Sequence, residues 1–295
     1  MPLRRLPLVF LVVLAAGCGS AAPPASSSAA PSIPPGSSAD ASGPWLRAST
    51  TQAIPPLARF AVPDTAVVTA DGRYVTVGPV DAIYPGPLLP NLRERTISDA
   101  GRQRILDEAA RLGLLGGQTD FTGRAIPGGQ VGRLDLTVDG IPVTLTGDPQ
   151  AQIQCITTPC DPPPGTPAAF AELWTRIGEP DTWLGADLGP DAPFVPQAYA
   201  LLVGPAPVAE AGLARAPVVL PVDLDLGAFG VPVAGGTQRC GIVDGGDATA
   251  VRPAFEAADQ LTQWIQGPTM SATFGLAVRS IVADEDPCAE TFGGS

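Results

Sequence analysis

The sequence predicts an α+β fold with mostly antiparallel sheets and a few covering helices. Three observations support this prediction. Apolar residues make up 45% of the 295 residues and charged residues only 16%, so the chain can bury a core. The chain also has 35 prolines and 34 glycines, which divide that core among short elements joined by turns. Finally, two Asp-Gly pairs stand between alternating apolar runs, a pattern typical of antiparallel hairpins.

The first half of the chain is expected to form two hairpin-helix units that share one sheet. In the first unit, residues 59–80 would form a hairpin with Asp71-Gly72 as its two-residue turn. That turn pairs Val68 with Val75. Helical spacing of apolar residues then predicts a helix over residues 97–115.

Helix caps and a second hairpin complete these two units. Ser98 can cap the first helix, and Thr166-Pro167 can open a second helix that ends at Gly178. Between the helices, Asp139-Gly140 is the expected turn of the second hairpin. The alternation around it predicts three cross-strand pairs on one face: Val138/Ile141, Leu136/Val143 and Leu134/Leu145.

The rest of the chain is expected to form a smaller β-α-β half that a disulfide ties together. A domain boundary is predicted near residue 190, with one α+β domain over residues 46–190 and the second half over 191–295. The expected elements of this half are strands near 199–203, 218–224, 239–243 and 272–282 and a helix over 250–265.

The N-terminus has the features of an export signal. Arg4 and Arg5 precede an apolar run over residues 6–16, which is too short to span a bilayer. The segment Leu14-Ala-Ala-Gly-Cys18 resembles the lipobox of bacterial lipoproteins, in which the cysteine receives a diacylglyceryl group. The alternative is an ordinary secretory signal whose cysteine is incidental.

The lipobox resemblance implies a signal peptide over residues 1–17 and a mature chain anchored to the cell membrane, outside the cytoplasm, through lipid on Cys18. Residues 18–45 consist mainly of Ser, Ala, Pro and Gly and are predicted to form a disordered tether. Much of the chain resembles bacterial cell-surface lipoproteins of unknown function, because it also has a Tyr84-Pro-Gly-Pro loop before a helix and a late cysteine pair. This resemblance implies a location and a similar fold but no activity.

The five cysteines fit this location. Lipidation of Cys18 would leave four cysteines, which can form disulfides in an oxidising compartment. We favour the pairs Cys155–Cys160 and Cys240–Cys288. The alternative is a zinc site formed by the four thiolates, but the C-x2-C spacing of structural zinc sites is absent.

Composition excludes several classes of enzyme. The chain has no histidine, and all 17 basic residues are arginine. Mechanisms that need an imidazole base, an imidazole metal ligand or a catalytic lysine are therefore excluded. The net charge of −12 disfavours nucleic acid as a partner. We expect no cofactor.

Carboxylates remain the main groups for catalysis. Glu172, Glu179 and Asp181 lie near Trp174 and Trp183 in the sequence and could face a sugar. The alternative is that Trp174 belongs to the core and the acids are solvated. The two Asp-Thr/Ser-Gly turns of aspartic proteases are absent.

Two further groups are candidates for binding. Asp223 and Asp225, on one side of a predicted strand, and the cluster Asp284, Glu285 and Asp286 are candidates for a calcium site, with Asp223, Asp225, Asp284 and Asp286 as the expected ligands. The alternative is that these acids are solvated. A loop stiffened by a disulfide and by prolines is a candidate partner-binding element. Its contact residues would be Ile156, Thr157, Thr158, Pro159 and Asp161.

These observations together favour a lipid-anchored, non-catalytic binding or envelope-interaction module with a possible protein or peptide partner. One alternative is a carboxylate-dependent hydrolase of extracellular or cell-wall glycans. Another is an inhibitor-like protein that presents the 155–165 loop. The sequence does not define an oligomeric state.

Overall fold

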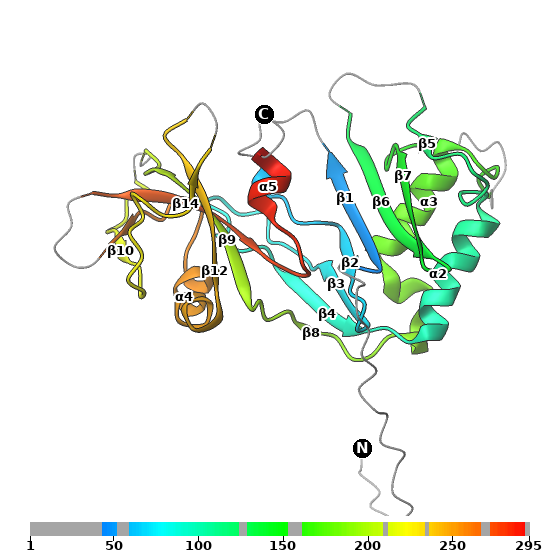
Figure 1. Ribbon diagram of the computed structural model, residues 1–295, viewed down its shortest axis with the longest axis horizontal. Helices are drawn as coiled ribbons and strands as arrows, with labels where there is room; N and C mark the ends of the chain where they lie inside the picture. The colour runs from blue at the N-terminus through cyan, green and yellow to red at the C-terminus, as the bar shows by residue number, and fades with distance from the viewer. Residues whose placement is uncertain are drawn as a thin grey trace, which may run out of the picture. The chain divides into compact units, whose positions relative to one another are not determined.

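The computed structural model describes residues 43–51, 59–123, 129–152, 161–208, 212–233, 236–266 and 272–292. The predicted signal peptide, the lipidated Cys18, the Cys155–Cys160 bond and most of the predicted tether lie outside these residues. Figure 1 shows two mostly antiparallel sheets and their helices, so the predicted α+β fold is confirmed. None of the described helices is long and apolar enough to cross a membrane.

The first sheet has eight strands in the order β5-β7-β6-β1-β2-β3-β4-β8. Its neighbours pair antiparallel except β5 and β7, which are parallel. The predicted hairpins correspond to β2–β3 and β6–β7, whereas β1 and β4 have no counterpart among the predicted elements. The strands are β1 Leu46–Thr51, β2 Ala66–Val68, β3 Arg73–Val77, β4 Leu92–Thr96, β5 Asp120–Phe121, β6 Val131–Val138, β7 Ile141–Gly147 and β8 Ala192–Pro193.

The β6–β7 hairpin has the predicted register. Val138 lies opposite Ile141, and the other two predicted pairs are also present. Asp139 and Gly140 form the turn with φ values of 50° and 78°. Positive φ at both positions is what a type I′ turn requires, so the Asp-Gly pair determines this register.

The β2–β3 hairpin differs from the prediction by one residue. Val68 pairs with Tyr74 rather than with Val75. The loop has three residues instead of two, because the Thr69 N–H donates to the Arg73 carbonyl at 2.9 Å and Gly72 has a φ of 88°. A glycine in the left-handed region at the third loop position is typical of three-residue hairpins.

Helices α2 (Asp99–Arg111) and α3 (Pro167–Gly178) pack on one face of this sheet. The predicted caps are confirmed: Ser98 Oγ and Thr166 Oγ1 accept first-turn N–H groups at 3.0 Å and 3.3 Å. Two short 3-10 helices, η1 (Pro180–Thr182) and η2 (Gly185–Asp187), follow α3. The buried core under α2 and α3 includes Leu46, Ala48, Tyr74, Leu134, Leu145, Ile105, Phe170, Leu173 and Ile177.

The second sheet has six strands in the order β10-β13-β14-β9-β12-β11. Its neighbours pair antiparallel except β10 and β13. In chain order, β8 is the last strand of the first sheet and β9 is the first strand of the second. The domain boundary near residue 190 stays a prediction. The strands are β9 Ala198–Pro205, β10 Val218–Val219, β11 Val231–Pro232, β12 Arg239–Asp244, β13 Trp264–Ile265 and β14 Phe274–Ser280.

Two predicted elements of the second half are wrong in extent. The helix expected over residues 250–265 is α4 (Gly245–Ala257), because Asp259 Oδ1 accepts the Leu261 N–H at 3.0 Å in a turn that follows the helix. The strand expected over 218–224 is only the two-residue β10. Pro221 has no N–H to continue its pairing.

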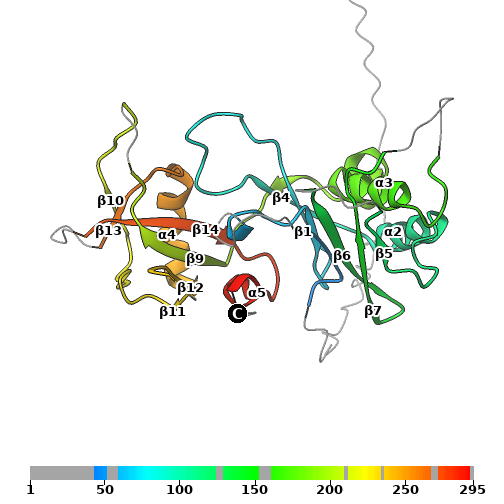
Figure 2. The same ribbon diagram turned by 90° about the horizontal axis from the view of Figure 1, so that it is seen from above.

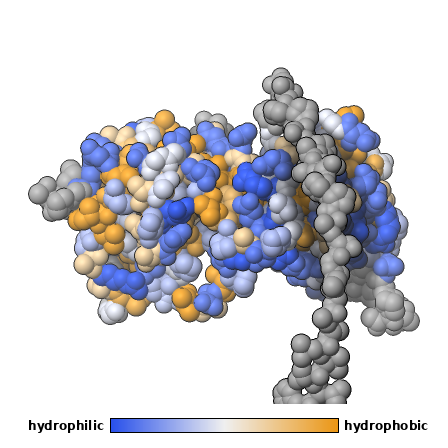
Figure 3. Space-filling view, turned by 90° about the horizontal axis from the view of Figure 1, so that it is seen from below, coloured by the Kyte–Doolittle hydropathy of each residue, from blue (hydrophilic) through white to orange (hydrophobic). Residues whose placement is uncertain are grey.

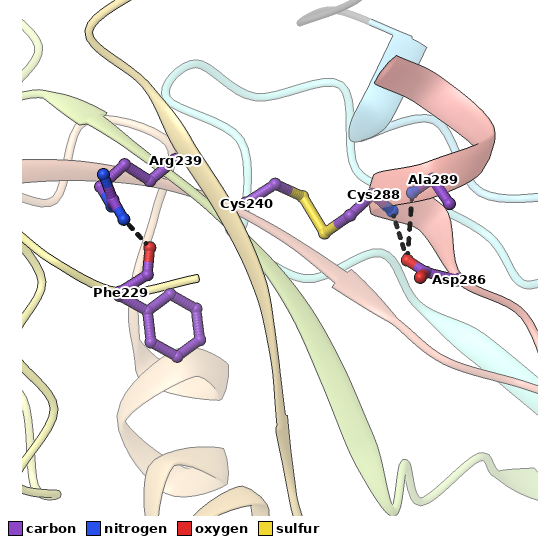
Figure 4. The surroundings of a disulfide bond; sticks show 6 residues. All are labelled: Phe229, Arg239, Cys240, Asp286, Cys288 and Ala289. Atoms are coloured by element: carbon purple, nitrogen blue, oxygen red, sulfur yellow. Dashed lines mark hydrogen bonds between the residues drawn. A yellow bond between two sulfur atoms is a disulfide. The ribbon is translucent and has the colours of Figure 1, made fainter. Parts of the chain in front are cut away.

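The predicted disulfide between Cys240 and Cys288 is confirmed (Figure 4). It joins β12 to the C-terminal helix α5 (Pro287–Phe292). Asp286 Oδ1 accepts the N–H groups of Cys288 and Ala289 at 3.0 Å and 3.1 Å, so it caps this short helix. The bond therefore holds α5 against the face of the second sheet opposite α4.

Candidate functional site

Buried charges gather where β1 and β14 approach the segment before α5. Arg47 lies on β1, Asp64 precedes β2, Arg279 lies on β14, and Glu285 precedes α5. Their side chains are 18%, 9%, 10% and 8% exposed. Charged side chains are rarely buried this far unless they are paired. These four residues, together with Glu290 of α5, are called the arginine–carboxylate cluster below.

Each buried carboxylate in the cluster is shared by two guanidinium groups. Asp64 Oδ2 lies 2.8 Å from Arg47 Nε and 3.2 Å from Arg279 Nη2. Glu285 Oε2 lies 3.1 Å from Arg47 Nη2 and 2.8 Å from Arg279 Nη2. Arg47 also donates to both oxygens of Glu290, at 2.9 Å and 2.8 Å. The cluster therefore links the first sheet to β14 and α5 through charge-assisted hydrogen bonds.

The pKa values of the cluster follow from burial and from an excess of acid. Burial opposes the charge on Arg47, but the hydrogen bond with Glu290 and the three nearby carboxylates outweigh it and raise the Arg47 pKa. Burial raises the Glu285 pKa above its ordinary value of 4.5, and the positive charges of Arg279 and Arg47 only partly oppose this. Two arginines face three carboxylates, so the cluster has one negative charge in excess when all are ionised.

A cleft of about 430 Å³ lies above this cluster. Alternation along β1 creates its floor: Leu46 and Ala48 point into the first core, so Arg47, Ser49 and Thr51 point into the cleft. The polar face of β6 extends this floor. The floor is therefore built on paired strands and is lined by hydroxyl and charged groups.

Arg59 differs from the other arginines that line the cleft. Its Nη2 donates to the main-chain carbonyl of Thr291 at 3.1 Å, and it forms no ion pair with the described residues. Arg133, in contrast, donates to both oxygens of Asp135 at 2.7 Å and 2.8 Å. Among the described residues Arg59 makes one hydrogen bond, so its guanidinium has donors left for a ligand anion.

In the described part of the chain, arginine holds the carboxylates in and beside the cleft. Asp64 and Glu290 are hydrogen-bonded to arginine and line the cleft. Asp135 is held by Arg133, and Glu285, whose pKa is raised, lies below the lining residues. A preformed polar cleft of this kind can bind a small ligand without reacting with it.

The acidic residues proposed for calcium lie apart from this cleft. Asp223 and Asp225 follow β10 outside any strand, and Asp225 accepts the N–H groups of a tight turn. Asp284 is exposed, and Asp286 caps α5. Among the described residues, no group of three or more Cys, Asp and Glu side chains is arranged to hold a metal ion.

Four of the five tryptophans and acids proposed to face a sugar have side-chain contacts within the fold; no side-chain hydrogen bond or ion pair is seen for Glu179 among the described residues. Trp174 is buried in the first core, and Trp183 donates from Nε1 to the Arg176 carbonyl at 2.7 Å. Glu172 accepts from Arg176 at 2.8 Å, and Asp181 is paired with Arg95. These contacts favour the core-and-surface alternative.

The candidate partner loop lies largely outside the described part of the chain. Ile156, Thr157, Thr158 and Pro159 are not described, and Asp161 is exposed. Its role as a partner contact stays a prediction.

The arginine–carboxylate cluster was not predicted from the sequence, which indicates only Glu285, as a member of the calcium candidate at residues 284–286. Arg47 and Glu290 are 243 positions apart in the chain, so no local motif could bring them together. One signal was available: Leu46-Arg-Ala-Ser alternates apolar and polar residues, which predicts a strand with one wet face. Glu285 lies between two exposed acids, and only the fold distinguishes it from them.

Comparison with protein-family models, with curated proteins and with solved structures finds no match to this chain.

Proposed function

We propose that this protein is a lipid-anchored, extracytoplasmic binding module that holds a small polar ligand in the cleft above the arginine–carboxylate cluster. The observation that carries the proposal is the guanidinium of Arg59, which lines a preformed cleft and forms no ion pair with the described residues. A guanidinium presents a planar fork of donors that matches a carboxylate. The ligand is therefore expected to carry a carboxylate together with hydroxyl or amide groups.

The rigidity of the cleft supports binding rather than catalysis. Its floor consists of paired strands, and its α5 wall is held by the Cys240–Cys288 bond and by Glu290. A preorganised site loses little conformational entropy when a ligand binds. The lipid anchor on Cys18 is part of the proposal and rests on the lipobox resemblance.

A thermal-shift panel tests this function on the mature chain, residues 18–295. The probes are amino acids, dipeptides, hexuronic acids and their uncharged amides. At a hundred times its dissociation constant, a ligand should add about 2.7 kcal/mol to the free energy of unfolding. We expect a carboxylate probe to raise the melting temperature and its amide to have little effect.

Two arginine variants locate the binding. Arg59→Gln should abolish the shift with little change in the ligand-free melting temperature, because Arg59 makes one hydrogen bond to a carbonyl. Arg239→Gln is the matched control. Among the described residues Arg239 also donates only to carbonyls, that of Phe229 (Figure 4) and that of Gly230, and it is not among the residues that line the cleft. This control variant should keep the ligand shift.

Two outcomes would contradict the proposal. One is a shift that survives Arg59→Gln. The other is mass-spectrometric detection of a cleaved ligand after incubation, which would favour a hydrolase.

A further inference from the structure

A second surface feature lies in the loop that joins β3 to β4, residues 78–91, which contains the Tyr84-Pro-Gly-Pro segment. Figure 2 shows this loop in cyan, projecting away from both sheets. Val80, Ile83 and Tyr84 at its tip are 56%, 63% and 61% exposed. The ten exposed large apolar residues of the described part thus include three within these five positions. Such a concentration marks an interaction surface more often than scattered exposed residues do.

The base of the loop is fixed to the folded part. At its neck, the Gly78 N–H donates to the Asn91 carbonyl at 2.6 Å, and Asn91 Nδ2 donates to the Pro79 carbonyl at 2.8 Å. On its returning arm, the Leu88 N–H donates to the Ala258 carbonyl at 3.0 Å. Gln260 N–H donates to the Gly86 carbonyl at 3.0 Å. The tip is therefore presented on a constrained support.

An apolar groove of about 510 Å³ continues from the tip toward β14. Leu88, Leu89, Leu276 and Val278 line it together with Val80 and Ile83. Asp81 is the one charged residue among the described residues that line the groove. Figure 3 shows that hydrophobic and hydrophilic residues are interspersed on one face, with hydrophobic areas reaching the surface around the second sheet.

We propose that the 80–84 tip inserts into the surface of a lipid bilayer, as a contact additional to the lipid anchor. This inference rests on the proposed anchoring at Cys18. Twenty-five residues separate Cys18 from Gly43, where the described fold begins. Fully extended, this length spans about 85 Å, so the anchor leaves the folded part free to turn its tip to the bilayer.

Charge and residue type favour a bilayer with neutral headgroups as the occupant. The chain has a net charge of −12, which opposes both anionic lipids and a second copy of itself. The loop over 78–91 has a single charge, on Asp81, and its tip combines aliphatic residues with a tyrosine. Aliphatic groups with an aromatic ring at the boundary are typical of interfacial membrane contacts.

Vesicle binding of an unlipidated mature chain tests this inference independently of the anchor. Residues 18–295 with Cys18→Ser are mixed with phosphatidylcholine vesicles, and the bound fraction is measured after sedimentation. We expect binding that persists at high salt. The double variant Val80→Asp/Ile83→Asp should bind at least about tenfold more weakly, because it removes the apolar side chains from the tip.

Ile141→Asp is the matched control, because Ile141 is 65% exposed on the β6–β7 hairpin, away from the loop. It should bind vesicles as the parent chain does. Equal vesicle binding by the control and the double variant, or no binding by the parent chain, would overturn the proposal. A concentration-dependent dimer that the double variant loses, without vesicle binding, would overturn it in favour of a second copy.

Failure of the proposed anchor gives a different result. In that case the wild-type protein recovered from the envelope has the mass of an unlipidated chain, whatever the tip variants do in the vesicle assay.

Discussion

The first sheet has α2 and α3 on one face, whereas the second sheet has α4 on one face and the disulfide-bonded α5 on the other. In the first sheet, β6 and β7 are eight and seven residues long and form an extended ladder. In the second, β9 and β14 are also eight and seven residues long, while β10, β11 and β13 have two residues each, as β5 and β8 have in the first. The long ladders of the two sheets are therefore similar, and what distinguishes the second is the covalent bond that holds α5 on its other face.

The difference extends to polar groups in the two cores. Tyr74 in the first core donates from its hydroxyl to the Ile177 carbonyl at 2.7 Å. Tyr199 and Trp264 in the second core are equally buried, but the Tyr199 hydroxyl and the Trp264 indole N–H have no hydrogen-bond partner among the described residues. The first core satisfies its buried phenol, and the second core leaves one unsatisfied.

Removing the disulfide should have the largest effect, and it should fall on the second sheet. Cys240 and Cys288 are separated by 48 positions, for which the chain-entropy model gives about 4 kcal/mol of stabilisation. Cys240→Ser/Cys288→Ser should lower the free energy of unfolding by this order. Hydrogen exchange should accelerate most in β9, β12 and α5 and least in β6 and β7. Equal acceleration in both sheets would contradict the comparison.

A pair of glutamates should show opposite pH dependence in the two regions. Glu108 on α2 accepts a hydrogen bond from Arg111, and this bond lowers the Glu108 pKa. The ionised form of Glu108 therefore stabilises the fold at pH values above about 4.5, and this contribution is lost as the pH falls. Burial raises the Glu285 pKa, so the folded protein holds that proton more tightly. The contribution of Glu285 to stability therefore decreases as the pH rises above 4.5.

Glutamine variants of Glu285 and Glu108 test these opposite pH dependences of stability. Glu285→Gln should be similar to the wild type near pH 4 and more stable at pH 7, because it removes the excess negative charge of the cluster. Glu108→Gln should be less stable than the wild type at pH 7 by about 0.5 kcal/mol and similar to it at low pH. Urea unfolding at a series of pH values measures both. Parallel pH profiles would show that the assigned pKa directions are wrong.

The two buried tyrosines should differ in the cost of losing their hydroxyl groups. Tyr74→Phe removes the hydrogen bond to the Ile177 carbonyl and should cost about 1–2 kcal/mol. Tyr199→Phe removes a buried hydroxyl that has no described partner and should be neutral or slightly stabilising. Burial also raises the pKa of Tyr199 to about 12, so ionisation should not complicate the comparison near neutral pH. Denaturant midpoints that fall equally in both variants would argue against the contrast.

How far the sequence predicts the fold depends on how local the determining signal is. The Asp139-Gly140 turn and the caps at Ser98 and Thr166 act within a few residues, and all three are confirmed. Thr69 to Arg73 shows the limit of such signals, because an Asp-Gly pair also fits a three-residue loop. Only the long-range pairing of β2 with β1 and β3 selects one register.

The candidate site is harder to predict for the same reason. The strand β1 directly follows a Pro- and Ser-rich segment. Its short alternation of apolar and polar residues is therefore difficult to distinguish from the end of the predicted tether. Arg47 contacts Glu285 and Glu290, 238 and 243 positions away, and Arg279 contacts Asp64, 215 positions away, so these contacts form only when the two sheets are in place. Spacing along the chain contains no information on such contacts. Paired cysteines are an exception, because oxidation limits the possible partners.

Hydrogen exchange of the mature chain, with and without the probe that gives the largest thermal shift, tests the proposed cleft most directly. Binding in the cleft predicts slower exchange in β1, β6 and α5, unchanged exchange in α2 and α3, and loss of this protection in Arg59→Gln. Protection that appears away from the cleft, or that remains unchanged in Arg59→Gln, would contradict the account.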